Sequence, residues 1–281
     1  MWGVDAIERW RGELAAWRIP GYILAGAEDS PWVLPRPVFT RRADRQLATP
    51  EGASLPAAWD ALDPPGSVLD VGAGAGSACL PLAPRCTGLT AVDADAELLA
   101  ELDRRAATHG LAARLVHGTW PAVAAEVAPA DVVLCHHVLY NVADLEPFVT
   151  ALTGHARGLV VAELADRHPL TALNPLWRHF HGIDRPEGPT AEDAVAALAE
   201  LGIHPTVRRW RRTPAAEHPD PEALVEVTRR RLCLPRTRTA EVAEALREHG
   251  HLDGETRDLG ASGSGIVTLT WPGTARSGAG R

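Results

Sequence analysis

The chain has 281 residues, of which 46% are hydrophobic and 23% charged, and its formal net charge is −8. That length suits one large α/β domain with an appendage, and the acidic balance disfavours a nucleic-acid partner, which usually meets a basic surface. The sequence has no run of about 18 apolar residues, so no membrane span is predicted. The N-terminal Met1–Asp5 shows no signal-peptide pattern, so we expect a cytoplasmic protein without a membrane partner.

Two residue types narrow the possibilities further. The four cysteines form no C-x-x-C pair, which predicts buried free thiols rather than a zinc or redox site; they are Cys79, Cys86, Cys135 and Cys233. One stretch, from His204 to Thr239, is rich in arginine despite the acidic total. It is either a solvated face that balances the acidic remainder or a docking surface, and the sequence leaves both open.

Residues 1–65 predict a helical appendage. Apolar side chains at Ile7, Trp10, Leu14 and Trp17 share one helix face. Asp5 is the expected N-cap of that helix, with Glu8 three residues on. Residues 26–58 are rich in proline and glycine, and a second short helix is expected over Leu55–Leu62.

From residue 67 onward, strands alternate with helices. The predicted strands are Ser67–Val71, Leu89–Val92, Arg114–His117, Asp131–Cys135, Gly158–Glu163, Pro205–Arg212 and Gly265–Trp271. Helices are expected at Cys79–Ala83, Ala96–Thr108, Leu145–Thr153, from the Thr190 N-cap to Glu200, Pro221–Leu232 and Thr239–His249. This alternation predicts an α/β fold, with a seven-stranded, mostly parallel sheet covered by helices on both faces.

The predicted domain spans residues 66–273, and residues 274–281 are expected to be a disordered tail. Residues 165–190 interrupt the alternation with prolines and aromatic side chains. Long irregular insertions in compact domains are often functional, so this segment is expected to be a lid or to face the substrate.

The strand at residues 67–71 runs into the sequence Asp70-Val71-Gly72-Ala73-Gly74-Ala75-Gly76. Glycines permit a sharp turn and a close approach to a ligand, and the N–H groups of a following helix would favour a carboxylate or phosphate. Ser77 replaces the third glycine of the dinucleotide fingerprint. The Asp70 carboxylate suits a cationic, amine-bearing ligand better than a pyrophosphate.

This combination resembles the class I methyltransferases that depend on S-adenosylmethionine (SAM), from about Leu55 to Trp271. The resemblance implies a Rossmann-like fold and SAM as the cofactor. Asp93, at the end of the second strand, would accept the two ribose hydroxyls, although a nicotinamide enzyme would want the same acid. The family's adenine-binding acid after the third strand is missing; Thr119 could replace it through its hydroxyl, and Trp120 could stack on adenine or belong to the core. The implied cofactor contacts are Asp70, Gly72, Ala73, Gly74, Gly76, Asp93, Ala94, Gly118, Thr119, Trp120 and Cys135.

The fourth strand ends at Cys135-His136-His137 and continues to Tyr140 and Asn141. Ligands of parallel sheets bind at the carboxyl ends of strands, so His136, His137 and Tyr140 are the candidate catalytic residues. A neutral imidazole there could remove a proton from an attacking hydroxyl or amine, or the two histidines could only cap backbone groups. No metal is expected: only His179-x-His181 has ligand-like local spacing, and the metal-dependent O-methyltransferases that this region resembles would require an aspartate beside the strand-four histidines.

The expected reaction is methyl transfer to an O or N nucleophile of a small molecule or peptide. The Asp/Asn-Pro-Pro-aromatic motif of nucleic-acid amino methyltransferases is absent after the fourth strand. Three alternatives remain: an RNA or protein methyltransferase that docks through the arginine-rich region, a SAM-binding protein without catalysis, and a nicotinamide-dependent oxidoreductase. Ser77, Asp70 and the absence of lysine argue against the last. The oligomeric state is left open.

Overall fold

The computed structural model describes residues 5–252, 259 and 264–275. Seven strands form one sheet in the order β3-β2-β1-β4-β5-β7-β6. They are β1 Gly66–Val71, β2 Cys86–Asp93, β3 Ala113–His117, β4 Ala130–His136, β5 Ala156–Ala165, β6 Thr206–Arg211 and β7 Gly265–Pro272. Only β7 runs antiparallel to its neighbours β5 and β6. The predicted mostly parallel, seven-stranded Rossmann-like sheet is therefore confirmed.

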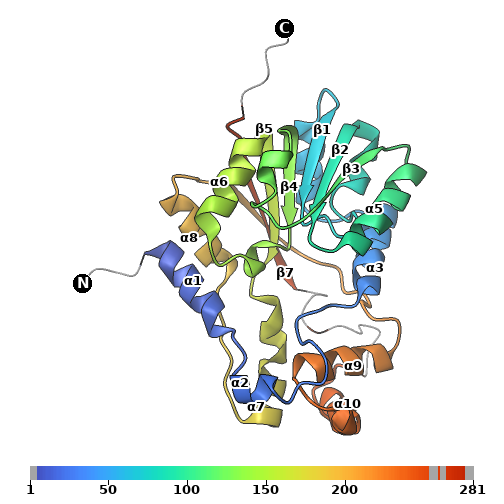
Figure 1. Ribbon diagram of the computed structural model, residues 1–281, viewed down its shortest axis with the longest axis vertical. Helices are drawn as coiled ribbons and strands as arrows, with labels where there is room; N and C mark the ends of the chain where they lie inside the picture. Colours follow the sequence, from blue (N-terminus) through green and yellow to red (C-terminus); the bar gives the residue numbers. More distant parts are fainter. Residues whose placement is uncertain (1–4, 253–258, 260–263, 276–281) are drawn as a thin grey trace.

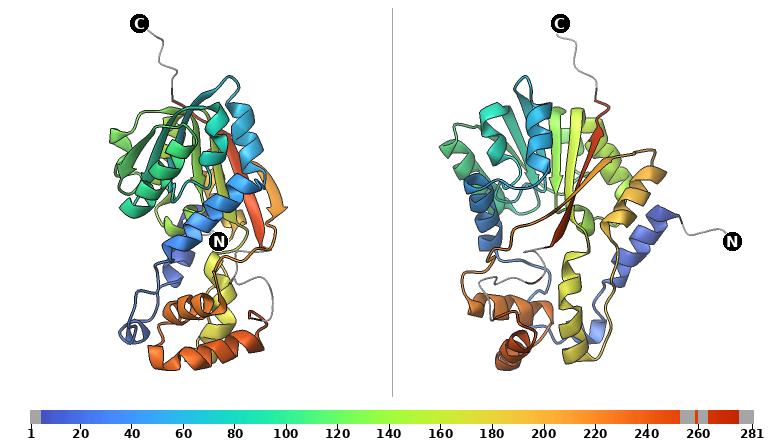
Figure 2. Two further views of the ribbon diagram at one scale, coloured as in Figure 1. Left: turned by 90° about the vertical axis from the view of Figure 1, so that its right-hand side faces the viewer. Right: turned by 180° about the vertical axis from the view of Figure 1, so that it is seen from behind.

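Helices cover both faces of the sheet (Figures 1 and 2). On one face α1 Ala6–Ala16, α6 Leu145–His155 and α8 Ala191–Glu200 bury apolar side chains such as Trp10, Phe148 and Leu198. On the other, α4 Ser54–Ala61 and α5 Ala96–Thr108 pack with the 3₁₀ helix η1 Leu80–Arg85 around Leu62, Leu82 and Leu102. The helix α4 packs on the sheet, although the predicted boundary after residue 65 assigned it to the appendage. The part of the chain that covers the sheet therefore begins before residue 66.

Helix starts follow the predicted capping. The Asp5 carboxylate accepts a hydrogen bond from the Glu8 N–H at 2.7 Å, and Thr190 forms a capping box with Asp193. Asp95 likewise caps α5, accepting from the N–H groups of Glu97 and Leu98. These side chains satisfy N–H groups that have no partner within the helix.

One local prediction is wrong. The segment after the glycine turn is a series of turns followed by a 3₁₀ helix, not an α-helix. Pro81 and Pro84 explain this, because proline has no N–H to donate and its ring clashes with a preceding carbonyl. The proline- and glycine-rich part of the helical appendage also contains a helix that the sequence analysis did not name, α3 Arg36–Ala48, which starts at Arg36-Pro37. Proline at the first turn of a helix is favourable.

A small helical cap lies apart from the sheet in Figures 1 and 2. It combines α2 Gly21–Leu24, the 3₁₀ helices η4 Pro169–Leu173 and η5 Arg236–Arg238, α7 Asn174–His181, α9 Pro221–Arg231 and α10 Thr239–Glu248. They share a separate apolar core that includes Ile19, Trp177, Leu224 and Leu246. The predicted insertion at 165–190 is thus one part of a cap drawn from three distant segments.

The remaining elements are short. The 3₁₀ helices η2 Ala124–Glu126 and η3 Leu139–Asn141 flank β4. In the predicted disordered tail, the N–H groups of Thr274 and Ala275 donate to the carbonyls of Thr153 and Ala156 at 2.9 Å, so that prediction is wrong for these two residues; residues 276–281 lie outside the described part. No helix in the described ranges is long and apolar enough to cross a membrane.

Candidate active site

The glycine turn leaves β1 at the carboxyl edge of the sheet. Gly72, Gly74 and Gly76 have φ values of 77°, 52° and 90°, in the region that favours glycine. A Cβ on Gly72 would overlap the Val138 side chain, and one on Gly76 would lie 2.7 Å from Leu80. The turn therefore needs glycine both for its backbone angles and for the close approach of Val138.

Asp93 holds the turn to the end of β2. Its two carboxylate oxygens accept hydrogen bonds from the Gly74 and Asp95 N–H groups, each at 2.8 Å. Each oxygen has a second lone pair, so the carboxylate retains capacity for hydroxyl donors. The Gly118 N–H donates to the Asp93 carbonyl at 3.0 Å, which brings the predicted residues Ala94, Gly118 and Thr119 to the same rim. Ala94 and Thr119 are exposed there.

Asp70 lies buried at the end of β1, with 1% of the residue's surface exposed. Neither carboxylate oxygen accepts a well-formed hydrogen bond, although the Cys79 thiol and N–H are close enough to favour the charged form. Burial, with a smaller contribution from the charge of Asp93, raises the pKa of Asp70 to about 7, against the lowering effect of the Cys79 thiol. An unpaired buried carboxylate is costly, and a cationic group at the turn would offset that cost. The carboxylate therefore fits a sulfonium and ammonium ligand such as SAM.

Two predicted cofactor contacts belong to the core instead. The Trp120 indole is buried among the residues around α6, where its Nε1–H donates to the Phe148 carbonyl at 3.3 Å and its ring meets the edge of His155. Trp120 is therefore not placed to stack on adenine. The Cys135 side chain is fully buried in the same core, and burial raises the pKa of its thiol. Cys135 points into the core on the α6 side of the sheet because alternate strand residues face the same side, whereas Trp120 reaches that core from the turn after β3.

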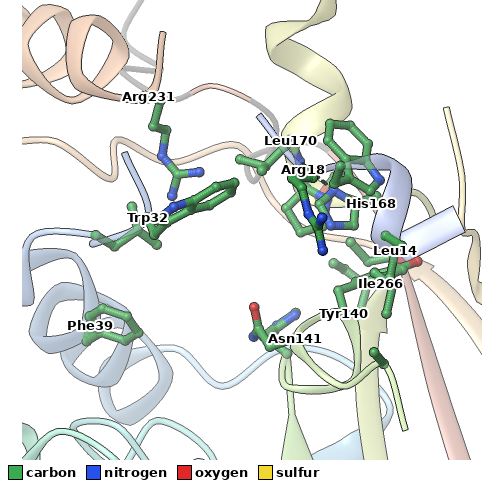
Figure 3. A pocket seen from close by; sticks show the side chains of 18 of the residues that line it. Leu14, Arg18, Trp32, Phe39, Tyr140, Asn141, His168, Leu170, Arg231 and Ile266 are labelled. Atoms are coloured by element: carbon green, nitrogen blue, oxygen red, sulfur yellow. Dashed lines mark hydrogen bonds between the residues drawn. The ribbon is translucent and has the colours of Figure 1, made fainter. Parts of the chain in front are cut away.

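A cavity of about 750 Å³ lies between the carboxyl edge of the sheet and the cap (Figure 3). Its walls are rich in rings, and its lining includes Trp17, Trp32, Phe39, His137, Tyr140, Asn141 and His168. Phe39, on α3, also comes within 3.4 Å of where a Gly74 Cβ would lie. Phe39 thus joins the cavity wall to the glycine turn, although no residue of the turn itself lines the cavity.

The three candidate catalytic residues have different surroundings. Tyr140 lines the cavity, but its hydroxyl donates to the Ala165 carbonyl at 2.7 Å and its ring stacks on Trp10. His136 does not line the cavity: it faces the α4 side of the sheet, where its Nε2 is buried without a partner. His137 alone combines a place in the cavity with an imidazole nitrogen near ionisable groups. The predicted catalytic role is therefore corrected for His136. Tyr140 forms part of the cavity wall, and its hydroxyl is already used in the hydrogen bond to the Ala165 carbonyl.

His137 has a φ of 59°, and its N–H donates to the Glu163 carbonyl at 2.6 Å. The Arg212 guanidinium is 2.6 Å from Nε2, whereas Glu163 Oε1 is 3.2 Å away. Burial lowers the pKa of His137 to about 4, with Glu163 opposing and Arg212 adding to the shift. The ring is therefore neutral at pH 7. We assign the shorter contact as the hydrogen bond, which places the ring proton on Nδ1.

Behind His137 lies a buried polar network that was not predicted from the sequence. Glu163 accepts a hydrogen bond from the Ser54 hydroxyl, which also lies 2.9 Å from the Thr268 hydroxyl. The neighbouring His136 and His137 rings, and the Ser54 hydrogen bond, hold the pKa of Glu163 below its usual value despite its burial. An acid at the end of a predicted strand was a visible signal for Glu163. For Ser54 and Thr268, 214 residues apart, the sequence held no such signal.

Gly72→Ala is expected to lower both the stability of the fold and the affinity for SAM, because the new Cβ adopts a strained φ and displaces Val138. A loss of about 2–4 kcal/mol in the free energy of unfolding is the expected scale, measured by urea denaturation. Gly12→Ala is the matched control: Gly12 is in the exposed part of α1 with open space around its Cβ position, so a gain of about 0.5–1 kcal/mol is expected. Equal effects of the two substitutions would contradict the tight packing at Gly72.

The side chains that could bind a metal ion are spread apart in the described part of the chain. No group of three or more His, Cys, Asp or Glu side chains in the described ranges has a geometry for holding a metal ion. The cavity histidine His168 instead stacks on Trp17 at 4.1 Å between ring centroids.

The comparisons with known proteins agree with the geometry. Residues 68–165 match the family model described as a methyltransferase domain. No curated protein matches the chain. Among solved structures, a SAM-dependent methyltransferase from Geobacter sulfurreducens in complex with S-adenosyl-L-homocysteine is 17% identical, with 85% of this chain and 98% of that chain covered and a TM-score of 0.49. Magnesium protoporphyrin IX methyltransferase from Synechocystis PCC 6803, with bound SAH, is 20% identical over 62% of this chain and 77% of that chain, with a TM-score of 0.46.

The family match covers the part of the chain that contains the glycine turn, Asp93 and the end of β4. That segment also has the strand order and the buried, unpaired Asp70 described above. Residues 68–165 therefore form a methyltransferase domain on a Rossmann-like sheet, and SAM is its cofactor.

Proposed function

We propose that the chain transfers the methyl group of SAM to an O or N nucleophile of a small molecule held in the cavity between the sheet and the cap. The observation that carries this is the cavity itself, which has aromatic walls from four separate segments, one of which, at Phe39, packs beside Gly74 of the glycine turn. A cavity of about 750 Å³ has the usual size of a small-molecule site. A folded macromolecule would need an open surface instead.

SAM, when bound, supplies the activated methyl group, and the protein's part is to bind, orient and exclude water. The Asn141 amide points into the cavity in Figure 3 and is exposed there, so it is placed to hold the hydroxyl or amine of an acceptor. His137 is neutral and already accepts from Arg212, which makes it a poor proton acceptor. Its proposed role is to position the acceptor, and the proposed nucleophile is one that needs no strong base.

The arginine-rich region gives limited support to a docking surface. Arg229 is fully buried and pairs with Asp29 and Glu226 at 2.7 Å. Arg230 donates to the carbonyls of Ser30 and Val33 at 3.2 Å, and Arg236 approaches Glu28 and Asp29. These arginines fasten the cap to residues 28–33, so they favour a role in building the cavity over one in binding RNA.

The test uses SAM labelled in its methyl group, with small-molecule extract, peptide digest and total RNA offered separately. Transfer to the small-molecule fraction alone is the expected result. Label in RNA or peptide would overturn the proposal, and binding of S-adenosylhomocysteine without transfer to any fraction would favour a non-catalytic SAM-binding protein.

Once an acceptor is known, Trp32→Ala is expected to raise its KM by about tenfold, since an aromatic wall contributes roughly 1–2 kcal/mol to binding. Trp32 is 52% exposed, so its removal costs the fold little. Tyr22→Ala is the control, because Tyr22 is 75% exposed in the cap and does not line the cavity. If Tyr22→Ala raised the KM as much as Trp32→Ala does, the result would contradict the proposed site.

A further inference from the structure

The cavity lining has a one-sided charge. Five arginines line it, and no aspartate or glutamate does among the described residues. They are Arg11, Arg18, Arg42, Arg212 and Arg231. A uniformly cationic wall favours anions and repels cations.

Three of the five already have carboxylate partners. Arg11 pairs with Asp144 at 2.9 Å. Arg42 makes a bidentate contact with Glu217, at 2.6 and 2.7 Å. Arg212 lies 3.8 Å from Glu163. Their charge is therefore largely compensated within the protein.

Arg231 and Arg18 differ from these three. Within the described part of the chain, neither lies within 4.0 Å of a carboxylate or makes a hydrogen bond through its guanidinium. Arg231 is half-buried at the end of α9, and burial, with the charges of Arg42 and Arg230, lowers its pKa to about 10, while the charge of Glu217 opposes the shift only in part. It stays protonated at pH 7, as a desolvated cation beside other cations. An anion bound there would stabilise it.

The position of Arg231 fixes where such an anion would lie. Figure 3 shows its guanidinium beside Trp32 on the cap side of the cavity, across the open space from Asn141. Asn141 and His137 follow β4, at the side of the glycine turn. In Figure 3 the Trp32 ring lies beside Arg231, and the rings of Phe39 and Tyr140 lie to either side of Asn141.

We propose that the methyl acceptor is a flat, ring-containing small molecule with an anionic group, and that Arg231, assisted by Arg18, binds that anion at the cap side while the nucleophile lies near Asn141. The inference rests on the proposed function and deepens it, since it names the acceptor's chemical class. A carboxylate is the preferred anion, because a guanidinium matches its two oxygens; a phosphate monoester shares that chemistry.

The test measures binding of matched probes to the protein saturated with S-adenosylhomocysteine. The probes are 4-hydroxybenzoate and 2-naphthoate, their neutral amides, and phenyl phosphate. At least one carboxylate is expected to bind about tenfold or more tightly than its amide. Tighter binding of phenyl phosphate than of both carboxylates would assign the site to phosphate esters. No preference for anions, or no binding of any anionic probe, would overturn the proposal.

Arg231→Gln is expected to remove the preference for the anion and leave the affinity for S-adenosylhomocysteine unchanged. Arg18→Gln should reduce the preference by less, because Arg18 is exposed. Arg208→Gln, an exposed arginine on β6 outside the cavity, is the control and should change neither affinity. If Arg231→Gln instead weakened S-adenosylhomocysteine, Arg231 would serve the cofactor's own carboxylate and the proposal would be wrong. If the unaltered protein bound no S-adenosylhomocysteine at all, that separate result would overturn the proposed function itself.

Discussion

Asp70→Asn is expected to raise the free energy of unfolding of the SAM-free protein at pH 8 by up to about 4 kcal/mol. The pKa of Asp70 is raised from 3.8 to about 7 in the folded protein, and about three pKa units correspond to roughly 4 kcal/mol. Because the folded state holds the proton more tightly, this group's favourable contribution is complete below about pH 4 and is lost as the pH rises through 7. Asparagine does not ionise, so the variant avoids that loss.

Urea denaturation of both proteins at pH 5 and pH 8 measures this effect. The stability difference between variant and unaltered protein should grow between the two pH values. Asp60→Asn is the control, since Asp60 is exposed at the solvent side of α4. A difference that stays constant with pH would show that Asp70 has an ordinary pKa and would remove the argument for a cationic ligand beside it.

The same substitution should lower the affinity for SAM by about tenfold, because it removes a negative charge from a buried position near a cationic cofactor. A gain in stability combined with a loss in cofactor affinity is typical of a residue retained for function. S-adenosylhomocysteine, which lacks the sulfonium charge, should lose less. Equal losses for the two ligands would indicate a change in the shape of the turn.

Asp93→Ala is expected to weaken binding of S-adenosylhomocysteine by about a hundredfold. The substitution leaves the Gly74 and Asp95 N–H groups without their acceptor and removes the carboxylate proposed to take the ribose hydroxyls. Hydrogen bonds to a charged group contribute about 1.5–3 kcal/mol each, so two lost contacts account for the expected factor. Asp103→Ala is the control, as Asp103 is exposed on α5.

Calorimetric titration gives both affinities, and circular dichroism checks that each variant is folded. Asp93→Asn should fall between the two, because one amide oxygen can still accept a hydrogen bond while the charge is lost. An Asp93→Ala protein that is folded and binds as tightly as the Asp103→Ala protein would remove Asp93 from the cofactor site.

The sequence predicted the strands well because each is a short apolar run between turn residues, and buried parallel strands have that pattern. It also predicted the glycine turn and Asp93, since both follow strands directly and their roles depend on local backbone geometry. The capping residues Asp5, Asp95 and Thr190 were visible for the same reason.

The cavity walls were less visible. Phe39 and Arg42 lie on a helix that the proline-rich composition concealed, and Arg231 meets Trp32 only because the cap joins segments about 200 residues apart. The strand pattern placed two histidines together at the end of β4, but it did not show that one faces α4 and the other the cavity. Trp120 shows the same limit: its place in the core depends on the packing of α6.

The glycine turn is expected to bind SAM, and the first experiment to make is a calorimetric titration with S-adenosylhomocysteine, with NAD as the comparison ligand. Binding of S-adenosylhomocysteine in the micromolar range, with no detectable binding of NAD, is the predicted result. Binding of NAD alone, or of neither ligand, would contradict the account.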